Sequence, residues 1–287
     1  MKKILAILMT AMIFITTGCL KRDTMEDILI YTSAYPIKYI TEELYGKNAT
    51  IESIYPTGIV INKYNLTDKQ LEDYSDCDLF IFNGLSNEKN YIKPMLTYNK
   101  NLKIIDASSS IEYTYRMEEM WLDPANFLMT AQNIKNGFEE YVTNQYLIKE
   151  IEDNYKQLKI NVSQIDAKTQ LMIQNASSKT IVVSNDLLKY LTKYGLDVIS
   201  LEGTDNSADK NIETVKEMIK SGKLKYIYTL KNEDVSDSIN ELIKDTKVEL
   251  VEFHTLSSLD ETEIKAGKDY ITIMNENIDS LKQQLYE

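Results

Sequence analysis

The sequence predicts an α/β fold of two lobes, each with a mostly parallel sheet flanked by helices, joined by one long spine helix. Short apolar or β-branched runs alternate with amphipathic helical stretches along the chain, a pattern typical of parallel sheets covered on both faces. The alternation stops once, at residues 147–175, which contain no Gly or Pro. The length of 287 residues also exceeds one typical domain of roughly 100–150 residues.

The N-terminal lobe is expected to span residues 27–146. Its predicted strands and helices are, in chain order, residues 28–32, 37–45, 67–74, 79–82 and 102–105. Tyr35-Pro36 follows the first strand and Pro56-Thr57-Gly58 follows the second, and both patterns indicate loops. In open α/β sheets the loops at strand ends bind ligands, so we expect the site there.

Residues 147–175 are predicted to form the linking helix, because apolar residues such as Leu147, Ile151 and Leu158 recur at three- and four-residue spacing. The C-terminal lobe, residues 176–287, then restarts the alternation of strands and helices. Its expected elements are residues 180–184, 186–194, 198–201, 212–221, 226–229, 236–245 and 249–253, with a final helix at 268–285.

The first residues are typical of a lipoprotein signal. Lys2 and Lys3 precede an apolar run at residues 4–15, which is too short for a comfortable membrane span, and Cys19 follows Gly18. We therefore predict a signal peptide at 1–18, lipidation of Cys19, and a tether at 19–26. The chain would then be lipid-anchored on the extracytoplasmic face of the cell membrane; the alternative is a secreted protein in which Cys19 is incidental.

Composition excludes several classes of function. The formal net charge of −12 disfavours nucleic acid as a partner, because binding requires neutralisation of phosphates. Cys77 is the only cysteine besides Cys19, so no intrachain disulfide is expected after lipidation, and Cys77 is predicted to be buried. No Ser-His-Asp order or Gly-rich phosphate loop occurs, so we expect no catalytic residues and no enzyme activity.

Four segments carry a resemblance to a known family. They are Trp121-Leu122-Asp123-Pro124 and residues 78–84, 104–108 and 194–203, and they occur in the family's order. Together they resemble the zinc/manganese substrate-binding lipoproteins of bacterial ABC importers, over residues 28–285. The resemblance implies a monomeric receptor that captures a divalent metal ion of the zinc or manganese class between its lobes. It also implies an ABC permease and its ATPase as partners.

The same resemblance places the metal ligands, which in that family are three histidines and an acidic residue. The three histidine positions correspond here to Asn62, Glu119 and Asn185. The fourth ligand falls either near residues 231–233 or in the loop that begins at His254, the only histidine of the chain. The implied metal site is therefore His254, Glu119, Asn62 and Asn185. His254 could equally be structural, and Glu119 could instead pair with Lys63 or lie in solvent.

The chemistry of this set is unusual for zinc, which favours imidazole, thiolate and carboxylate ligands. Asn62 and Asn185 offer neutral amide oxygens, which suit harder cations. Lys63 would repel a dication, so zinc binding of the usual kind is not expected from these residues. Asp186, Glu233 or Asp260 could restore acidity.

Aromatic residues support two other interpretations. Lys63, Tyr64 and Trp121 could line a cleft for a metal chelate or a small organic ligand, because Tyr and Trp offer flat apolar faces with a polar tip. These aromatics could instead belong to the cores of the lobes. A surface interaction protein with a vestigial cleft is the remaining alternative.

Overall fold

The computed structural model describes residues 25–203 and 208–286. The predicted signal peptide, Cys19 and most of the tether lie outside the described residues, so their prediction is not addressed. Within the two described ranges, no helix combines the length and the apolar character needed to cross a membrane.

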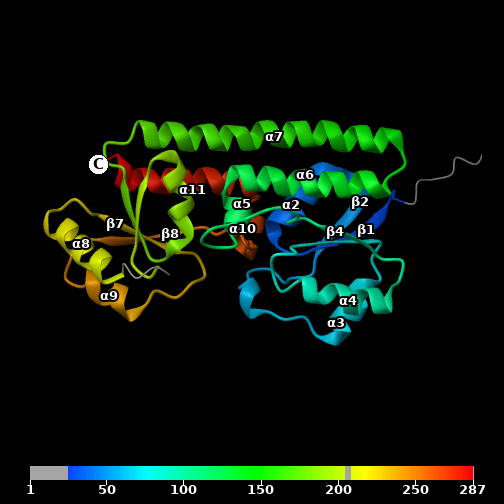
Figure 1. Ribbon diagram of the computed structural model, residues 1–287, viewed down its shortest axis with the longest axis horizontal. Helices are drawn as coiled ribbons and strands as arrows, with labels where there is room; N and C mark the ends of the chain where they lie inside the picture. The colour runs from blue at the N-terminus through cyan, green and yellow to red at the C-terminus, as the bar shows by residue number, and fades with distance from the viewer. Residues whose placement is uncertain (1–24, 204–207, 287) are drawn as a thin grey trace, which may run out of the picture.

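The first sheet is fully parallel, with strand order β2-β1-β3-β4. Its strands are β1 (Ile28–Thr32), β2 (Ala49–Ser53), β3 (Leu79–Phe82) and β4 (Lys103–Asp106). All four side chains of β3 are buried, as expected for an inner strand covered on both faces. The loops that follow these strands gather at one edge of the sheet, which faces the second lobe (Figure 1).

Helices cover both faces of this sheet (Figure 1). The first face is covered by α2 (Tyr35–Tyr45) and α6 (Pro124–Tyr141), and the second by α3 (Asp68–Ser75) and α4 (Lys89–Tyr98). A short helix, α5 (Glu119–Leu122), directly precedes α6, with Asp123 as the N-cap of α6. The predicted burial of Cys77 is confirmed, since only 1% of the residue is exposed.

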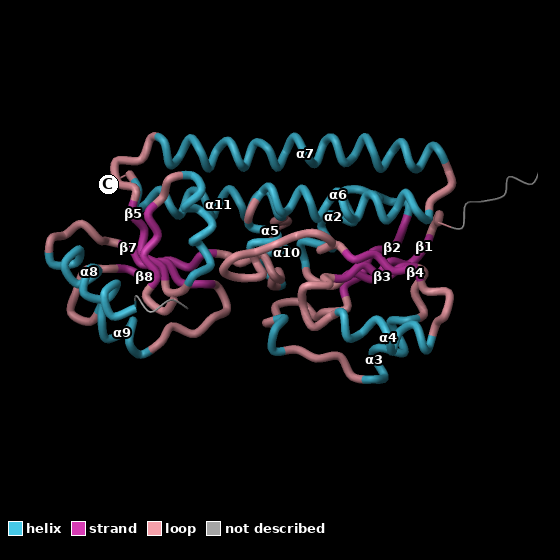
Figure 2. The backbone as a smooth tube through the Cα atoms, viewed as in Figure 1, coloured by secondary structure: helices cyan, strands magenta, loops and turns pink. Residues whose placement is uncertain are grey.

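The spine is α7 (Gln145–Gln174), a single helix of 30 residues that runs along both lobes (Figure 2). The Asn144 side chain accepts a hydrogen bond from the Tyr146 amide and caps its start. Its apolar stripe includes Leu158 and Val162, which are fully buried. The helix contacts α2 and α6 of the first lobe and α11 (Tyr270–Leu285) of the second, so it packs against both lobes.

The second sheet repeats the first, with parallel order β6-β5-β7-β8. Its strands are β5 (Thr180–Val183), β6 (Asp197–Ser200), β7 (Tyr226–Leu230) and β8 (Glu249–Phe253), and its helices are α8 (Ala208–Lys220), α9 (Asp237–Ile243), α10 (Glu261–Lys265) and α11. Residues 186–194 form a 3-10 helix. The predicted fold class, two α/β lobes on a spine helix, is confirmed.

The two lobes meet through the loops at their strand ends. The buried Trp121 donates from its Nε1 atom to the Thr255 carbonyl oxygen at 2.8 Å and accepts at its own carbonyl from the Tyr270 hydroxyl at 2.7 Å. The Gly58 amide also donates to the Leu259 carbonyl at 3.0 Å. These contacts tie the carboxyl edge of one sheet to that of the other.

Candidate metal centre

A group of polar side chains occupies this junction, and we call it the cleft cluster. It consists of Asn62, Arg116, Glu118, Asn185 and Glu233. Each member follows a strand: Asn62 lies in the 3-10 turn Ile61–Lys63 after β2, Arg116 and Glu118 lie between β4 and α5, Asn185 follows β5, and Glu233 follows β7. Parallel strands place these loops at one edge, which is where α/β sheets bind ligands.

Arg116 is the centre of the cluster. Its guanidinium donates to the Glu118 carboxylate from Nε at 3.2 Å and from Nη2 at 3.0 Å. It also donates to Glu233, from Nη1 at 3.3 Å and from Nη2 at 2.6 Å. Glu118 belongs to the first lobe and Glu233 to the second. One planar cation therefore makes a paired contact with a carboxylate of each lobe, the geometry in which Arg binds most strongly.

The two asparagines of the cleft cluster lie next to its carboxylates. The Asn185 amide nitrogen donates to Glu233 at 3.2 Å, while its oxygen accepts from the Leu187 amide at 3.0 Å and caps the 3-10 helix. Asn62 lines the same small pocket as Glu118 and Glu233, whose volume is about 40 Å³. A space of that size has room for a small ion together with a few water molecules.

The electrostatic balance of the cluster favours a cation. Burial alone would lower the pKa of Arg116, but the hydrogen bonds and charges of Glu118 and Glu233 raise it above its usual value. The guanidinium therefore stays charged between two carboxylates. Lys231 also lines the small pocket, but its ammonium is neutralised by Asp260 and Glu263, so Glu118 and Glu233 still exceed Arg116 by one negative charge. Glu118 is only 6% exposed, so its interaction with a cation is weakly screened by water.

Glu119, a predicted ligand, faces a different set of atoms. Its carboxylate accepts from the backbone amides of Thr114, Tyr115 and Arg116, at 3.2, 2.8 and 2.9 Å. The residue is 5% exposed, so it does not lie in solvent, and no ion pair joins it to the exposed Lys63 in the described residues. Glu119 shapes the loop that carries Arg116, and in this conformation its oxygens are already used.

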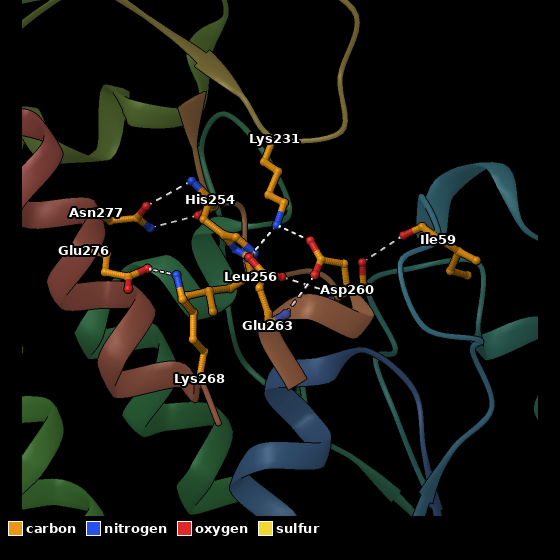
Figure 3. A network of polar contacts seen from close by, with 10 residues as sticks. Ile59, Lys231, His254, Leu256, Asp260, Glu263, Lys268, Glu276 and Asn277 are labelled. Carbon is orange, nitrogen blue, oxygen red and sulfur yellow. Dashed lines mark hydrogen bonds and ion pairs between the residues drawn. The ribbon is translucent and has the colours of Figure 1, made fainter. Parts of the chain in front are cut away.

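His254 lies in a polar network of the second lobe (Figure 3). Its Nδ1 atom accepts from the Leu256 amide at 2.9 Å, and its Nε2 atom lies 3.1 Å from the Glu263 carboxylate, without hydrogen-bond geometry. Glu263 also binds the Lys231 ammonium. Burial lowers the pKa of His254, and the Glu263 carboxylate opposes this effect. Lys231 of this network lines the same small pocket as Asn62 and Glu233, but His254 does not, and it makes no contact with Asn62 or Asn185 in the described residues.

The three residues predicted to line an organic-ligand cleft lie in three different surroundings and do not share one cleft. Trp121 is buried in the contact between the lobes. The Tyr64 hydroxyl accepts from Gln70 at 2.9 Å, and its ring packs edge-on against Tyr55 with centroids 6.0 Å apart. Lys63 is exposed. In the described ranges, no group of three or more His, Cys, Asp or Glu side chains is arranged to hold a metal ion.

The sequence interpretation missed Arg116 and Glu118. One signal was available: Arg116 is one of only two arginines in the chain, with Arg22, and it lies five residues before the Trp-Leu-Asp-Pro segment. An arginine so rare in a lysine-rich chain indicates a position where paired hydrogen bonds matter, because lysine cannot supply them.

Comparison with known proteins assigns the family. The family model described as zinc-uptake complex component A, periplasmic, matches residues 30–284. The chain is 23% identical to the zinc-binding lipoprotein AdcA of Streptococcus pneumoniae over 310 residues, covering 99% of this chain and 61% of AdcA. It is 23% identical to the high-affinity zinc uptake system protein ZnuA of Bacillus subtilis, covering 89% and 87%. The chain thus spans little more than half the length of the AdcA proteins it matches.

Solved structures agree on the fold. The Zn(II)-bound ZnuA-like domain of S. pneumoniae AdcA superposes with a TM-score of 0.73, at 23% identity, and covers 91% of this chain and 100% of that domain. The metal-dependent lipoprotein YcdH from B. subtilis gives a TM-score of 0.75 at 20% identity, covering 91% and 100%. The family match over nearly the whole described chain therefore places this protein in the zinc-uptake component A family.

Proposed function

We propose that this protein is the substrate-binding receptor of an ABC importer, which captures a divalent metal ion between its lobes and delivers it to a membrane permease. Family membership supports the receptor role. The observation that best supports a metal ion as the ligand is that Glu118 of one lobe and Glu233 of the other bind a single cation. In our proposal the metal ion takes the place of the Arg116 guanidinium.

The proposed ligands are the carboxylates of Glu118 and Glu233 with the amide oxygens of Asn62 and Asn185. Both asparagines belong to the set that the sequence predicts. Glu118 and Glu233 are better candidates than Glu119 and His254, because they already bind a cation and lie with Asn62 around one small pocket. Asn185 would have to rotate its amide, since its nitrogen now faces Glu233.

The donor set bears on the choice of metal. Zinc accepts carboxylate oxygen, and it normally exceeds manganese in affinity for a given set of ligands. Oxygen donors without imidazole also suit manganese, so they discriminate between the two metals less than histidines do. We therefore propose zinc as the preferred cargo and manganese as a competitor.

Arg116 gives the metal-free receptor a defined state. While its guanidinium neutralises Glu118 and Glu233, the buried Glu118 carboxylate is not left as an unpaired charge, which would be costly. A metal ion must displace the guanidinium, which then moves toward solvent. The cost of breaking these four hydrogen bonds lowers the apparent affinity for metal and eases release at the permease.

We further propose that the receptor acts as a monomer held at the membrane by a lipid on Cys19. Its partners would be an ABC permease and the ATPase that powers it. The relative AdcA of S. pneumoniae is itself named a lipoprotein, which supports the anchor. Radiolabelled palmitate incorporated by the wild-type chain and not by Cys19→Ala would support this; equal labelling would contradict it.

Calorimetric titration of metal-stripped protein with zinc tests the ligands. Glu118→Gln and Glu233→Gln should each weaken binding by about tenfold or more, because each removes a charge next to the metal. Glu217→Gln, an exposed residue of α8 that loses the same charge, is the matched control and should bind like the wild type. Unchanged affinity in both cluster variants, or no zinc binding by the wild type, would contradict the proposal.

A further inference from the structure

A second pocket between the lobes is large enough for an organic molecule. Its volume is about 440 Å³, within the roughly 300–1,000 Å³ range of small-molecule sites. Helix α2 and the loop after β2 supply the wall from the first lobe, and residues 257–259, Ile264 and residues 268–269 supply the wall from the second. The pocket thus contacts both lobes and differs from the small pocket of the cleft cluster.

Hydrogen bonds between the lobes lie next to both pockets. The Ser258 hydroxyl donates to the Ile59 carbonyl at 3.0 Å (Figure 3), and the Gly58 amide donates to the Leu259 carbonyl. Ile61, Ser257 and Ser258 line both pockets, so the pockets adjoin. A molecule in the larger pocket would rest against the same loops that carry the cleft cluster.

Three tyrosines give the larger pocket aromatic walls. Tyr35 and Tyr39 lie one turn apart on α2, with ring centroids 6.3 Å apart and planes inclined by 41°, and Tyr55 approaches from the loop after β2. Tyr39 is held in place by stacking on Tyr270 at 5.6 Å. Aromatic faces carry negative electrostatic potential, so inclined rings in one pocket attract cations.

Acidic side chains add to that potential. Glu42, Glu43 and Asp269 line the pocket. Lys38 pairs with Glu42 at 3.6 Å, whereas the Lys268 ammonium binds Glu276 at 2.7 Å, outside the lining.

Two of these carboxylates have oxygen atoms available to bind a ligand. Glu43 has no ion pair within the described residues, and burial with the nearby charge of Asp269 raises its pKa. Asp269 caps α11 by accepting from the Thr272 amide at 2.7 Å through one oxygen, which leaves the other oxygen available. Two lysines also line the pocket, but Lys38 pairs with Glu42 and Lys268 with Glu276, so neither pairs with Glu43 or Asp269.

Ser33 also contributes to the lining, but it supports the pocket wall and is no contact for a ligand. The residue is completely buried, and its hydroxyl faces the Glu88 carboxyl and lowers the pKa of that group.

We propose that this pocket binds a small organic cation, an alkylamine or a quaternary ammonium compound. The positive group would lie against Tyr35, Tyr39 and Tyr55 and be neutralised by Glu43 and Asp269. Because the pocket contacts both lobes, an occupant stabilises their observed arrangement. This site uses none of the cleft cluster residues, so it does not depend on the proposed metal capture.

Calorimetric titration with choline and with putrescine tests the site. We expect at least one of them to bind the wild type, and 3,3-dimethylbutanol, the neutral carbon analogue of choline, to bind at least about tenfold more weakly. The double variant Glu43→Gln with Asp269→Asn should lose binding; the asparagine preserves the helix cap, so folding is maintained. Its circular dichroism and melting temperature are measured to confirm this.

Controls separate this site from the cleft cluster. Glu233→Gln and the exposed control Glu217→Gln should bind the organic cation like the wild type. Absence of binding by both cations, equal binding of the neutral analogue, or loss of binding in Glu233→Gln would each overturn the proposal. Failure of zinc binding alone would leave it standing, because the two sites share no proposed ligand.

Discussion

Arg116 places a permanent positive charge where carboxylates of two lobes meet. A guanidinium forms paired hydrogen bonds with Glu118 and Glu233 that a lysine could not reproduce. In a receptor for a dication, such a residue acts as an internal competitor. The measured affinity for metal then reflects the difference between two binding free energies at the same carboxylates, that of the metal ion and that of the Arg116 guanidinium.

Substitution of Arg116 by glutamine should therefore strengthen zinc binding, by about tenfold or more, because the buried Glu118 and the exposed Glu233 lose their shared cation and repel each other until a metal binds. Arg116→Lys keeps the charge and is expected to fall between the variant and the wild type. Competition with a fluorescent zinc chelator gives the affinities. Weaker zinc binding in Arg116→Gln would show that the guanidinium assists the site instead of competing for it.

Glu119 leads to a different expectation. Because its carboxylate accepts three backbone amides, Glu119→Ala should lower the free energy of unfolding by about 1–3 kcal/mol per amide group left unsatisfied and away from water. Urea unfolding of the metal-free protein measures this loss. If Glu119→Ala left the free energy of unfolding unchanged and abolished zinc binding, Glu119 would be a ligand, as the sequence resemblance implies.

Our proposed ligands share Asn62 and Asn185 with the set that the sequence resemblance implies, but they replace Glu119 by Glu118 and His254 by Glu233. Asn62 and Asn185 follow strands, and a parallel sheet brings such positions to one edge, so their placement was predictable. Glu118 and Glu119 are adjacent acids at the start of α5, and nothing in the sequence indicates which one faces the cleft. The choice is made by the preceding loop, whose amides all converge on Glu119.

At the scale of elements, Glu88 joins the ends of the first sheet. It accepts from the Asn83 amide after β3 at 2.8 Å and from the Tyr55 hydroxyl after β2 at 3.3 Å, and it lies near Ser33 after β1. Burial raises the pKa of Glu88 to about 7, and these hydrogen bonds oppose the rise only in part.

This pKa makes the stability of the protein depend on pH. The folded carboxyl, at about 7, holds its proton where the unfolded one, at 4.5, has lost it. Stability from this group is therefore full below the unfolded value and is lost as pH rises through 7, by on the order of 3 kcal/mol at most. Glu88→Gln should flatten this decline in urea unfolding measured from pH 5 to pH 8. A slope equal to that of the wild type would contradict the assignment.

Helices differed in how well they could be predicted. The spine was expected at residues 147–175 and is observed at Gln145–Gln174, because a long uninterrupted apolar stripe has few alternatives. Residues 186–194 also show apolar spacing but form a 3-10 helix between the Asn185 cap and Gly195, whose φ is 88°. In so short a segment, the contacts at its two ends decide between an α-helix and a 3-10 helix. The spacing of apolar residues does not reveal those contacts.

At the scale of the whole molecule, α7 connects the two lobes, and we expect them to unfold as one cooperative unit. It packs on α2 and α6 from the first lobe and on α11 from the second. Trp121 and Tyr270 add a buried connection between the lobes. Such a frame permits limited movement of the strand-end loops, which suits capture and release of a small ion more than wide closure of the lobes.

Cooperativity can be tested at the middle of the spine. Leu158→Ala should lower the free energy of unfolding by about 2–5 kcal/mol, because Leu158 is fully buried and the truncation leaves a cavity. Thermal unfolding followed by calorimetry should remain a single transition at a lower temperature. Two separate transitions, with only one displaced, would show that the lobes unfold independently of the spine.

The most direct measurement of the central claim follows the Arg116 side chain itself during metal binding. In protein labelled with ¹⁵N-arginine, the Nε–H signal of Arg116, assigned by its loss in Arg116→Gln, reports the contact with Glu118 and Glu233. Added zinc should bind and shift this signal to the position of a solvent-exposed arginine, with faster hydrogen exchange. Zinc binding that leaves the Arg116 signal unchanged, or no zinc binding at all, would contradict capture of the metal at this place.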